Sequence, residues 1–186
     1  MLENKSYAKF WDRAGAYLLD MIIIGVFSFG LNYLNFTIFK SFLIYLPIAL
    51  IAILYKPYME SSYGSTFGKM LLNLKVVGEN FEGINFKRSF MRSFILIFPA
   101  ILFIPIYFMA FQDPSVINAA DFVLAMQANY PTLGLIGNIS FFIILIDLIV
   151  LLAKKERLRS LHDIIANTYV LKDLSNSENK TVANNI

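Results

Sequence analysis

Four apolar stretches, each about as long as a helix that crosses a lipid bilayer, constrain this chain more than any other feature. They run over residues 14–36, 41–59, 93–111 and 133–153. The hydrocarbon core of a bilayer is about 30 Å thick, and a helix needs about 20 apolar residues to cross it. Only 16% of the 186 residues are charged and 58% are hydrophobic, with a mean hydropathy of +0.62. These values exclude a soluble fold and predict an all-α membrane protein, a four-transmembrane-helix bundle.

Prolines and short connections shape the expected bundle. Only residues 37–40 separate the first two spans, so these spans are expected to form a tight antiparallel hairpin. Pro47 lies in the second span, and Pro99 and Pro105 lie in the third. Because proline removes a backbone hydrogen bond, we expect kinked helices at these positions.

The basic residues fall on one side of the predicted bundle. Of the 16 lysines and arginines, 15 lie in the N-terminal arm, between residues 56 and 92, or after residue 153, and only Lys40 lies opposite. The positive-inside rule therefore places both termini and the 60–92 loop in the cytoplasm, which we expect to be bacterial. Basic clusters at 87–92 and 154–159 are expected to bind anionic lipid headgroups. They lack the features of a nucleic-acid interface, so no nucleic-acid partner is expected.

The remaining segments complete a single domain over residues 1–173. Residues 72–77 and 168–171 alternate like short strands and are expected to pair, and residues 174–186 are expected to form a disordered cytoplasmic tail. The outer loop at 112–132 is expected to contain an amphipathic helix that begins near Pro114. Its apolar residues, expected on the membrane or on the helix ends, are Val116, Phe122, Leu124 and Met126.

An acidic residue interrupts the first span. Asp20 follows Arg13 by seven residues, almost two helical turns, so both side chains project from one face. A charge at this depth costs about 2.5–3.5 kcal/mol on insertion scales, which makes Asp20 a candidate functional residue. Further polar residues share a stripe with this pair on the first helix: Tyr17, Ser28, Asn32 and Asn35.

A second acidic residue, Asp147, lies in the fourth span at the depth predicted for Asp20, with Ser140 and Lys154 on its face. If the two stripes face each other, Asp20 and Asp147 form one site that holds a proton or a cation, because two adjacent carboxylates do not both ionise in a low dielectric. The alternative is that Asp20 is structural and pairs with Arg13, Arg92 or Arg157. For Asp147 a structural or accessory role is favoured.

The polar segments outside the spans exclude several kinds of site. The Gly64-Ser-Thr66-Phe-Gly68-Lys69 loop lacks the glycine spacing of a phosphate-binding loop, and Met70 follows its lysine. His162 is the only histidine and cysteine is absent, so we expect no metal, cofactor or catalytic site of the usual kinds. Asp163 is expected to form a surface salt bridge or a helix cap, and His162 to be at most a pH-sensing gate.

These residues together resemble the RDD family of membrane proteins. The resemblance rests on Arg13 with Asp20, on the loop motif Gly64, Thr66, Gly68 and Lys69, and on Leu161-His162-Asp163 with Ala166 and Thr168. It implies that Arg13, Asp20 and Asp163 are the arginine and two aspartates of the family name. It also implies a polytopic helical domain with a suspected role in transport and no defined substrate. Asn167 departs from the usual glycine, and the 112–132 loop is longer than usual.

Two functions are expected from these features. The first is a small transporter or a proton- or sodium-coupled carrier that works as a homo-oligomer, since four helices rarely enclose a path alone. The second is a membrane scaffold or accessory subunit that binds a membrane-protein partner and whose buried polar residues are structural. Enzymatic activity is not expected, because the spans contain neither cysteine nor histidine.

Overall fold

The protein is described by a computed structural model that covers residues 5–153 and 159–173. Within these residues, four helices are long and apolar enough to cross a membrane, as predicted. They are α1 (Phe10–Leu34), which η1 (Asn35–Phe39) continues as a π-helix, α2 (Phe42–Tyr63), α4 (Phe86–Ala110) and α7 (Thr132–Ala153). Pro47 and Pro57 lie inside α2, and Pro99 and Pro105 lie inside α4.

Two helices extend further than their apolar stretches. α2 continues to Tyr63, and α4 begins at Phe86, where the Asn85 side chain accepts a hydrogen bond of 2.9 Å from the Arg88 backbone N–H. The predicted bounds end these helices where apolarity ends, whereas capping and packing set the true ends. Charged residues assigned to the 60–92 loop, among them Glu60 and Arg92, therefore belong to helices.

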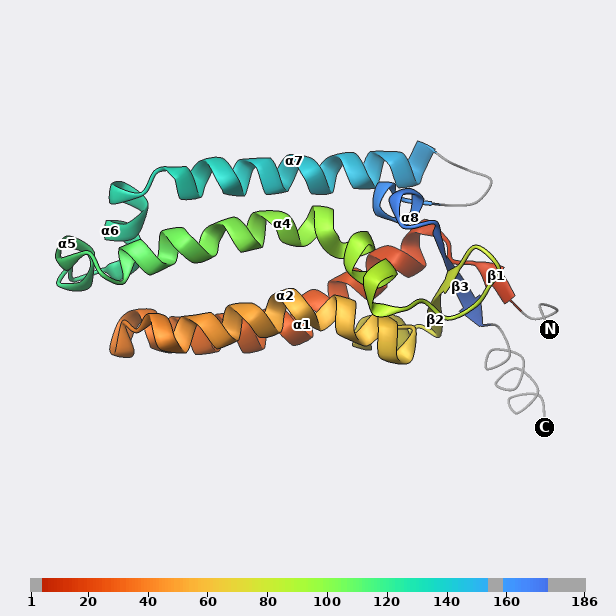
Figure 1. The fold of residues 1–186 in the computed structure, drawn as a ribbon, viewed down its shortest axis with the longest axis horizontal. Helices are drawn as coiled ribbons and strands as arrows, with labels where there is room; N and C mark the ends of the chain where they lie inside the picture. The colour runs from red at the N-terminus through yellow and green to blue at the C-terminus, as the bar shows by residue number, and fades with distance from the viewer. Residues whose placement is uncertain (1–4, 154–158, 174–186) are drawn as a thin grey trace.

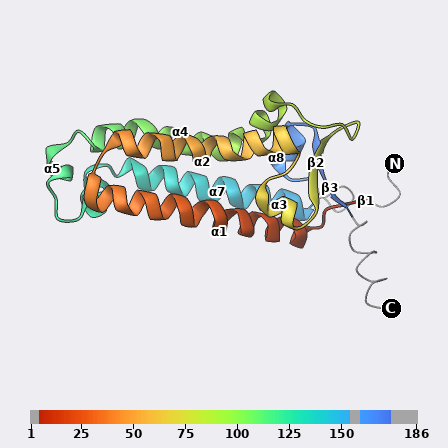
Figure 2. The same ribbon diagram turned by 90° about the horizontal axis from the view of Figure 1, so that it is seen from below.

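The long helices run side by side (Figures 1 and 2), and α2 and α4 pack on each other. α1 packs on α2 and α3, and α7 packs on α4 and α8. α1 and α2 form the predicted hairpin, in which the Asn35 side chain bonds both the backbone N–H and the carbonyl of Ser41 at 3.0 Å. Because α1 and α7 bury little of their surface, their outer faces are left for lipid or another protein.

One end of the bundle, named the sheet end, carries β1 (Lys5–Tyr7), α3 (Phe67–Leu71), β2 (Leu74–Gly78), α8 (Leu161–Ile165) and β3 (Thr168–Asp173) (Figure 1). The strands form an antiparallel sheet in the order β1-β3-β2, with Val76 opposite Val170 and Ser6 opposite Lys172. The predicted pairing of 72–77 with 168–171 is therefore confirmed. The strand β1 is not predictable, because three residues are too few for a readable alternation.

The other end, named the loop end, carries α5 (Pro114–Ile117) and α6 (Phe122–Asn129). The prediction of one amphipathic helix is wrong in this respect: two short helices form, each capped by an aspartate side chain. Leu124 is 63% exposed and does not pack on the helix ends, whereas Val116, Phe122 and Met126 are buried there, as expected. The buried cluster at this end includes residues of α2, α5 and α6 and the residue that follows α4, namely Tyr45, Phe111, Val116, Phe122 and Met126.

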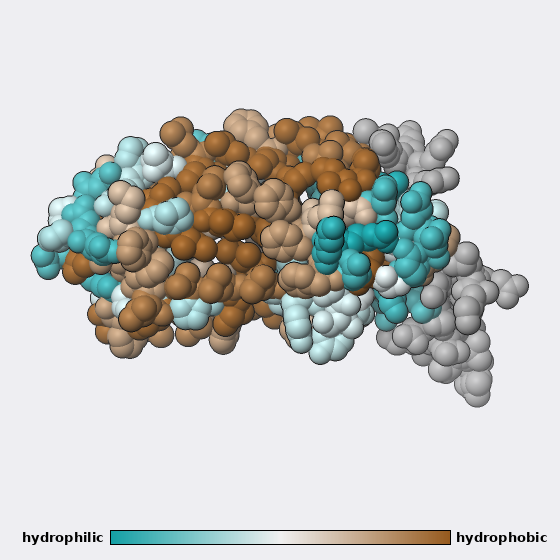
Figure 3. Space-filling view, in the orientation of Figure 1, coloured by the Kyte–Doolittle hydropathy of each residue, from teal (hydrophilic) through white to brown (hydrophobic). Residues whose placement is uncertain are grey.

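The surface follows the same division. A hydrophobic band covers the middle of the bundle, and hydrophilic residues gather at its two ends (Figure 3). At the loop end, Lys40 turns inward, and its ammonium donates to the carbonyls of Ile117 at 2.6 Å and Ala119 at 3.0 Å. This distribution is typical of a membrane protein whose middle part lies in the hydrocarbon core of a bilayer.

Candidate functional site

Asp163 lies at the centre of a buried ion network at the sheet end. Its side chain is fully buried, with Arg13 Nη1 at 2.5 Å from Oδ2 and Arg92 Nη2 at 2.7 Å from Oδ1. The same carboxylate accepts from the Ser160 backbone N–H at 3.2 Å and so caps α8. The prediction of a cap is confirmed, and that of a surface salt bridge is wrong. Asp163 ties α8 to α1 and α4 because both arginines reach it.

Glu60 extends this network to α2. It is fully buried, its Oε2 lies 2.7 Å from Arg92 Nη1, and its Oε1 pairs with the ammonium of Lys69. The network therefore runs in the order Arg13, Asp163, Arg92, Glu60, Lys69 and joins α1, α8, α4, α2 and α3. Sequence reasoning missed Glu60. The signal available in the sequence was a charged pair one turn apart, Lys56 with Glu60, next to an apolar stretch.

Asp20 serves a different group, the loop that leads into α3. Its Oδ2 accepts the Thr66 hydroxyl at 2.6 Å, and its Oδ1 accepts the Gly68 backbone N–H at 2.8 Å and the Tyr55 hydroxyl at 2.8 Å. The Tyr55 oxygen in turn accepts the Phe67 backbone N–H at 2.9 Å. Asp20 thus satisfies the Gly68 N–H in the first turn of α3, as a capping side chain does, but from another helix.

The glycines of the loop motif permit this contact. A Cβ added at Gly68 would lie 2.1 Å from the Ala16 carbonyl oxygen and 2.9 Å from the Asp20 backbone nitrogen. Gly64 ends α2 in the left-handed region, with φ of 73°, and its carbonyl accepts the Val76 N–H at 2.7 Å. The loop therefore brings a backbone N–H and a hydroxyl to the protein's own carboxylate.

Asp147 pairs with His162, which lies on α8. The His162 Nδ1 is 2.8 Å from Asp147 Oδ1 and 2.9 Å from Oδ2, and the His162 backbone N–H donates to Oδ1 at 3.1 Å. On its other side, His162 Nε2 lies 3.3 Å from Arg92 Nη2. Since arginine can only donate, Nε2 accepts and Nδ1 carries the proton, so His162 is a neutral imidazole.

The structure engages Asp20 and Asp147 through separate partners, with no hydrogen-bonding residue in common in the described ranges. The arginines expected to pair with Asp20 do not: Arg13 and Arg92 bind Asp163 instead. Arg157 lies outside the described residues. Whether the two aspartates act on one ligand stays a prediction.

The polar stripes of α1 and α7 occupy the less exposed faces of their helices. Ser28 accepts the Asn32 side-chain N–H on its carbonyl at 3.0 Å, and the Ser140 hydroxyl donates to the Ile136 carbonyl at 2.7 Å. Tyr17, placed in the same stripe, is 50% exposed. Lys154 lies outside the described residues. Asn32 and Ser140 therefore bond within their own helices, whereas Arg13, Asp20, Asn35 and Asp147 bond to other segments. In the described ranges no hydrogen bond joins the two stripes.

Lys56 differs from the other charged residues of this region. It lies on α2 one turn before Glu60, inside a membrane-spanning helix. In residues 5–153 and 159–173 it makes no hydrogen bond or ion pair, although it lies close enough to Asp147 and Glu60 to interact with their charges. A lysine inside a span is a candidate functional residue.

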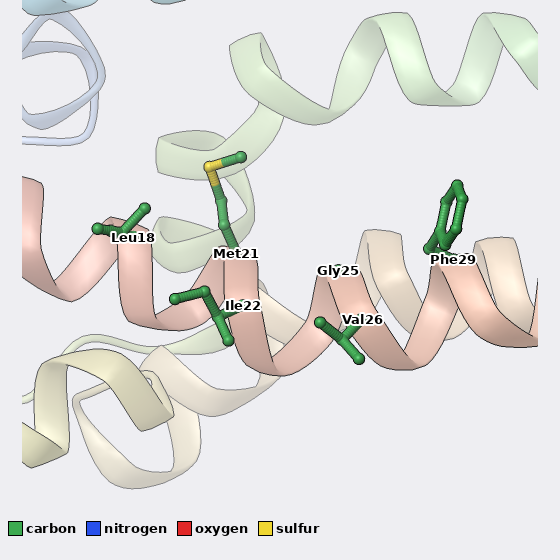
Figure 4. Close-up of a pocket in the computed structure, with 6 residues that line it drawn as sticks. All are labelled: Leu18, Met21, Ile22, Gly25, Val26 and Phe29. Atoms are coloured by element: carbon green, nitrogen blue, oxygen red, sulfur yellow. The ribbon is translucent and has the colours of Figure 1, made fainter.

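The hollows on the surface of the bundle are apolar and lie away from these charges. One of about 350 Å³ lies along α1 (Figure 4), and a second of about 480 Å³ lies between α1 and α3. Neither is lined by a polar side chain: the first is lined by Leu18, Met21, Ile22, Gly25, Val26 and Phe29. They suit lipid chains, so the candidate site is the polar cluster.

A comparison with known families matches residues 7–167 to the RDD family. The chain belongs to the RDD family. No curated protein and no solved structure matches the chain. In this RDD protein, two of the family-motif residues, Arg13 and Asp163, meet directly, and the third, Asp20, holds the Thr66 and Gly68 loop. The departure at Asn167 has a simple account, because this asparagine adopts a left-handed backbone with φ of 49°.

The stability of this RDD protein is expected to fall in acid through His162. Burial, followed by the positive charge of Lys56, lowers the pKa of His162 from 6.5 to about 4. The unfolded chain therefore takes up the proton first. The His162 contribution, about 3 kcal/mol, is fully present above pH 6.5 and is lost as the pH falls through 4.

Denaturant titrations in micelles at pH 7.5, 5.5 and 4.5 measure this effect. The His162→Gln variant should show a flatter profile over the same range, because glutamine does not titrate. The arginines beside Asp163 hold the pKa of Asp163 well below its usual range. The stability that Asp163 contributes is therefore lost only below pH 3.8. An equal slope in both proteins between pH 6.5 and 4 would contradict the assignment.

Proposed function

We propose that this RDD protein is a small membrane carrier that couples transport to protons, with its site in the polar cluster of Lys56, Asp147 and His162. The observation that carries the proposal is Lys56, an ammonium within a membrane span that has no hydrogen bond or ion pair in the described ranges. Ionisable residues are costly in a bilayer and commonly mark substrate or proton pathways. The hydrogen-bonded His162 and Asp147 are suited to exchanging a proton beside it.

Protons are favoured over sodium as the coupling ion. Sodium requires free oxygen ligands, but both carboxylate oxygens of Asp20 and of Asp147 already accept hydrogen bonds. A cation would have to displace these donors, whereas a proton only needs one of the oxygens. The coupling role therefore moves in this proposal from Asp20 to Asp147 with His162.

A second candidate function, a membrane scaffold or accessory subunit, is supported by Asp20. Its three hydrogen bonds are all to the α2 and α3 region, so its charge fixes the fold without any ligand. In that case the exposed faces of α1 and α7 would bind a membrane-protein partner. If the protein is a carrier, the same faces would instead form the contacts of a homo-oligomer.

The orientation and setting belong to this proposal too. The excess of lysine and arginine at the sheet end supports a cytoplasmic location for that end, in the cytoplasmic membrane of a bacterium. Anionic lipid headgroups would lie beside these bases. No enzymatic activity is proposed.

Flux through liposomes tests the proposal. Vesicles that contain the wild-type protein should dissipate an imposed pH gradient faster than empty vesicles, and Asp147→Asn should reduce the rate to that of empty vesicles. Asp20→Asn should instead lower the stability by about 1–3 kcal/mol. The Asp20 carboxylate accepts three hydrogen bonds, and the amide has only one acceptor oxygen. The control Asp121→Asn, at an exposed helix cap, should change neither property.

The two functions give different results in this assay. If wild-type vesicles are as tight as empty ones for protons, sodium and potassium, the carrier is refuted and the scaffold is favoured. If Asp20→Asn abolishes flux in a protein of wild-type stability, the site lies at Asp20 and the placement at Asp147 is wrong.

A further inference from the structure

The sheet end of the bundle holds buried hydrogen-bond donors that have no acceptor in the described part of the chain. Arg13 is 9% exposed, and its Nε and Nη2 have no hydrogen-bond partner among the described residues. The hydroxyls of Ser89 and Ser93 are fully buried on α4, on either side of Arg92 in the sequence, and they too lack partners within residues 5–153 and 159–173. An unpaired buried polar group is costly, so several of them in one region call for a common explanation.

In the described residues the carboxylates of this region do not accept from these donors, and their oxygens are in contact with other groups. Asp163 holds Arg13 on one oxygen and Arg92 on the other. Glu60 holds Lys69 on one oxygen and has Arg92 Nη1 at 2.7 Å from the other. Both oxygens of Asp147 face His162. In the described residues, Arg13, Ser89 and Ser93 therefore leave a surplus of unpaired donors at this end, beside one acceptor, Glu60 Oε2, that likewise lacks a hydrogen bond.

Lys56 adds the strongest donor to this surplus. It lies one turn from Glu60 on α2 and makes no hydrogen bond or ion pair in the described ranges. Glu60 contacts Arg92, and Arg92 contacts Asp163, which Arg13 also binds, so Lys56 and Arg13 approach the same few ion pairs from α2 and α1. A ligand that carries its own acceptors would satisfy both.

We propose that the sheet-end cluster binds a small oxyanion, a carboxylate or phosphate group, with Lys56 as its ionic anchor and Arg13 as a second donor. This inference rests on the proposed carrier function and assigns its substrate class. Ammonium and guanidinium groups are the side chains that bind oxyanions most strongly, and guanidinium can offer two parallel N–H groups. The free Nε and Nη2 of Arg13 are two such groups on one guanidinium.

Oxyanion binding would also take up a proton. His162 faces Lys56 from α2, Arg92 from α4, Asp147 from α7 and Asp163 from its own helix. The positive charge of Lys56 helps to hold the pKa of His162 at about 4. An oxyanion on Lys56 offsets that charge and favours the imidazolium, and by linkage a protonated His162 favours the oxyanion. Binding should therefore tighten as the pH falls.

Equilibrium binding tests the site separately from transport. Sodium phosphate and sodium acetate are titrated into the full-length protein in phosphatidylcholine nanodiscs, with heat of binding and thermal stabilisation as the readouts. Lys56→Gln should weaken binding at least about tenfold, as expected for loss of a charge-assisted contact. Lys56→Arg should restore binding, and the control Lys87→Gln, at an exposed position of α4, should bind like the wild type.

A further variant, Lys56→Met, distinguishes lost binding from lost folding. Because the lysine has no acceptor in the described ranges, its removal should leave the unfolding temperature unchanged or raised while it abolishes stabilisation by phosphate. If Lys56→Met unfolds at a clearly lower temperature and phosphate still stabilises it, Lys56 is structural and the proposal is overturned.

The oxyanion can come from solution or from a lipid headgroup. If neither soluble anion binds, retention of phosphatidylglycerol is measured by native mass spectrometry after purification from mixed nanodiscs. Retention lost in Lys56→Gln assigns the site to lipid phosphate, and retention that is independent of Lys56 overturns the proposal. Lys56-dependent binding without flux refutes the carrier alone, whereas flux without Lys56-dependent binding refutes this inference alone.

Discussion

Replacing Asp163 with asparagine is expected to lower the free energy of unfolding by about 3–5 kcal/mol, one of the largest effects of any single substitution in this protein. Asp163 is fully buried and contacts both Arg13 and Arg92 within 2.7 Å. Among the described residues, the neutral amide leaves Arg13 without a counter-charge and leaves Arg92 with Glu60 alone. It also weakens the cap of α8, because Asp163 accepts the Ser160 N–H.

An exposed ion pair of the same length supplies the matched control. Arg88 and Glu82 lie 2.7 Å apart, but their side chains are 38% and 43% exposed. Exposed pairs of this kind contribute about 0–1 kcal/mol, so Glu82→Gln should hardly change stability. Denaturant titration in mixed micelles, followed by circular dichroism, measures both variants. If Asp163→Asn costs no more than Glu82→Gln, the buried network is not what joins the helices.

A double-mutant cycle identifies the cause of the loss. Arg13→Met and Asp163→Leu remove both members of one ion pair, and Arg92 keeps Glu60 as its partner. Because replacing both partners by apolar groups spares the protein an unpaired charge, the double variant should be more stable than the sum of the single losses predicts. Simple additivity would mean that the two side chains act independently.

The membrane spans were predictable from the sequence because one requirement, apolar length, determines them. The charges at their ends were not. Glu60 and Arg92 were assigned to the 60–92 loop, since the apolar windows stop short of them, and the helices continue through both residues. Once Arg92 is on α4 and Glu60 on α2, the strongest contact between these helices becomes ionic as well as apolar.

Long-range folding explains the error at Asp163. Its position beyond the fourth span placed it in water, but α8 folds back under the bundle and brings Asp163 to Arg13, which is 150 residues away in the chain. Nothing local in the sequence encodes that contact. The family resemblance grouped Arg13 with Asp163 by name, and the geometry supplies the reason.

The loop motif is a second contact that the sequence alone does not reveal. Its glycine and threonine were rejected as a phosphate cradle because the spacing is wrong. The loop nevertheless surrounds an anion, the carboxylate of Asp20, with a hydroxyl and a backbone N–H. The residue types indicated an anion-binding loop, and only the fold shows that the anion belongs to the protein.

Gly68→Ala tests that contact most directly and should cost about 2–4 kcal/mol through overpacking and loss of a hydrogen bond to a charge. The new Cβ would lie 2.1 Å from the Ala16 carbonyl oxygen, and backbone atoms cannot move aside as a flexible side chain can. α3 must therefore move away from α1, which breaks the bond from the Gly68 N–H to Asp20.

The same substitution at Gly25, also on a helix of this protein, should have the opposite sign. No atom lies within 4 Å of a Cβ at Gly25, so Gly25→Ala should gain up to about 1 kcal/mol from helix propensity. Thermal unfolding of the two variants side by side separates close packing from propensity. Equal stabilities would mean that α3 is not held against α1. The charge of Asp20 in the span would then lack a structural role, and Asp20 would again be the favoured candidate for the transport site.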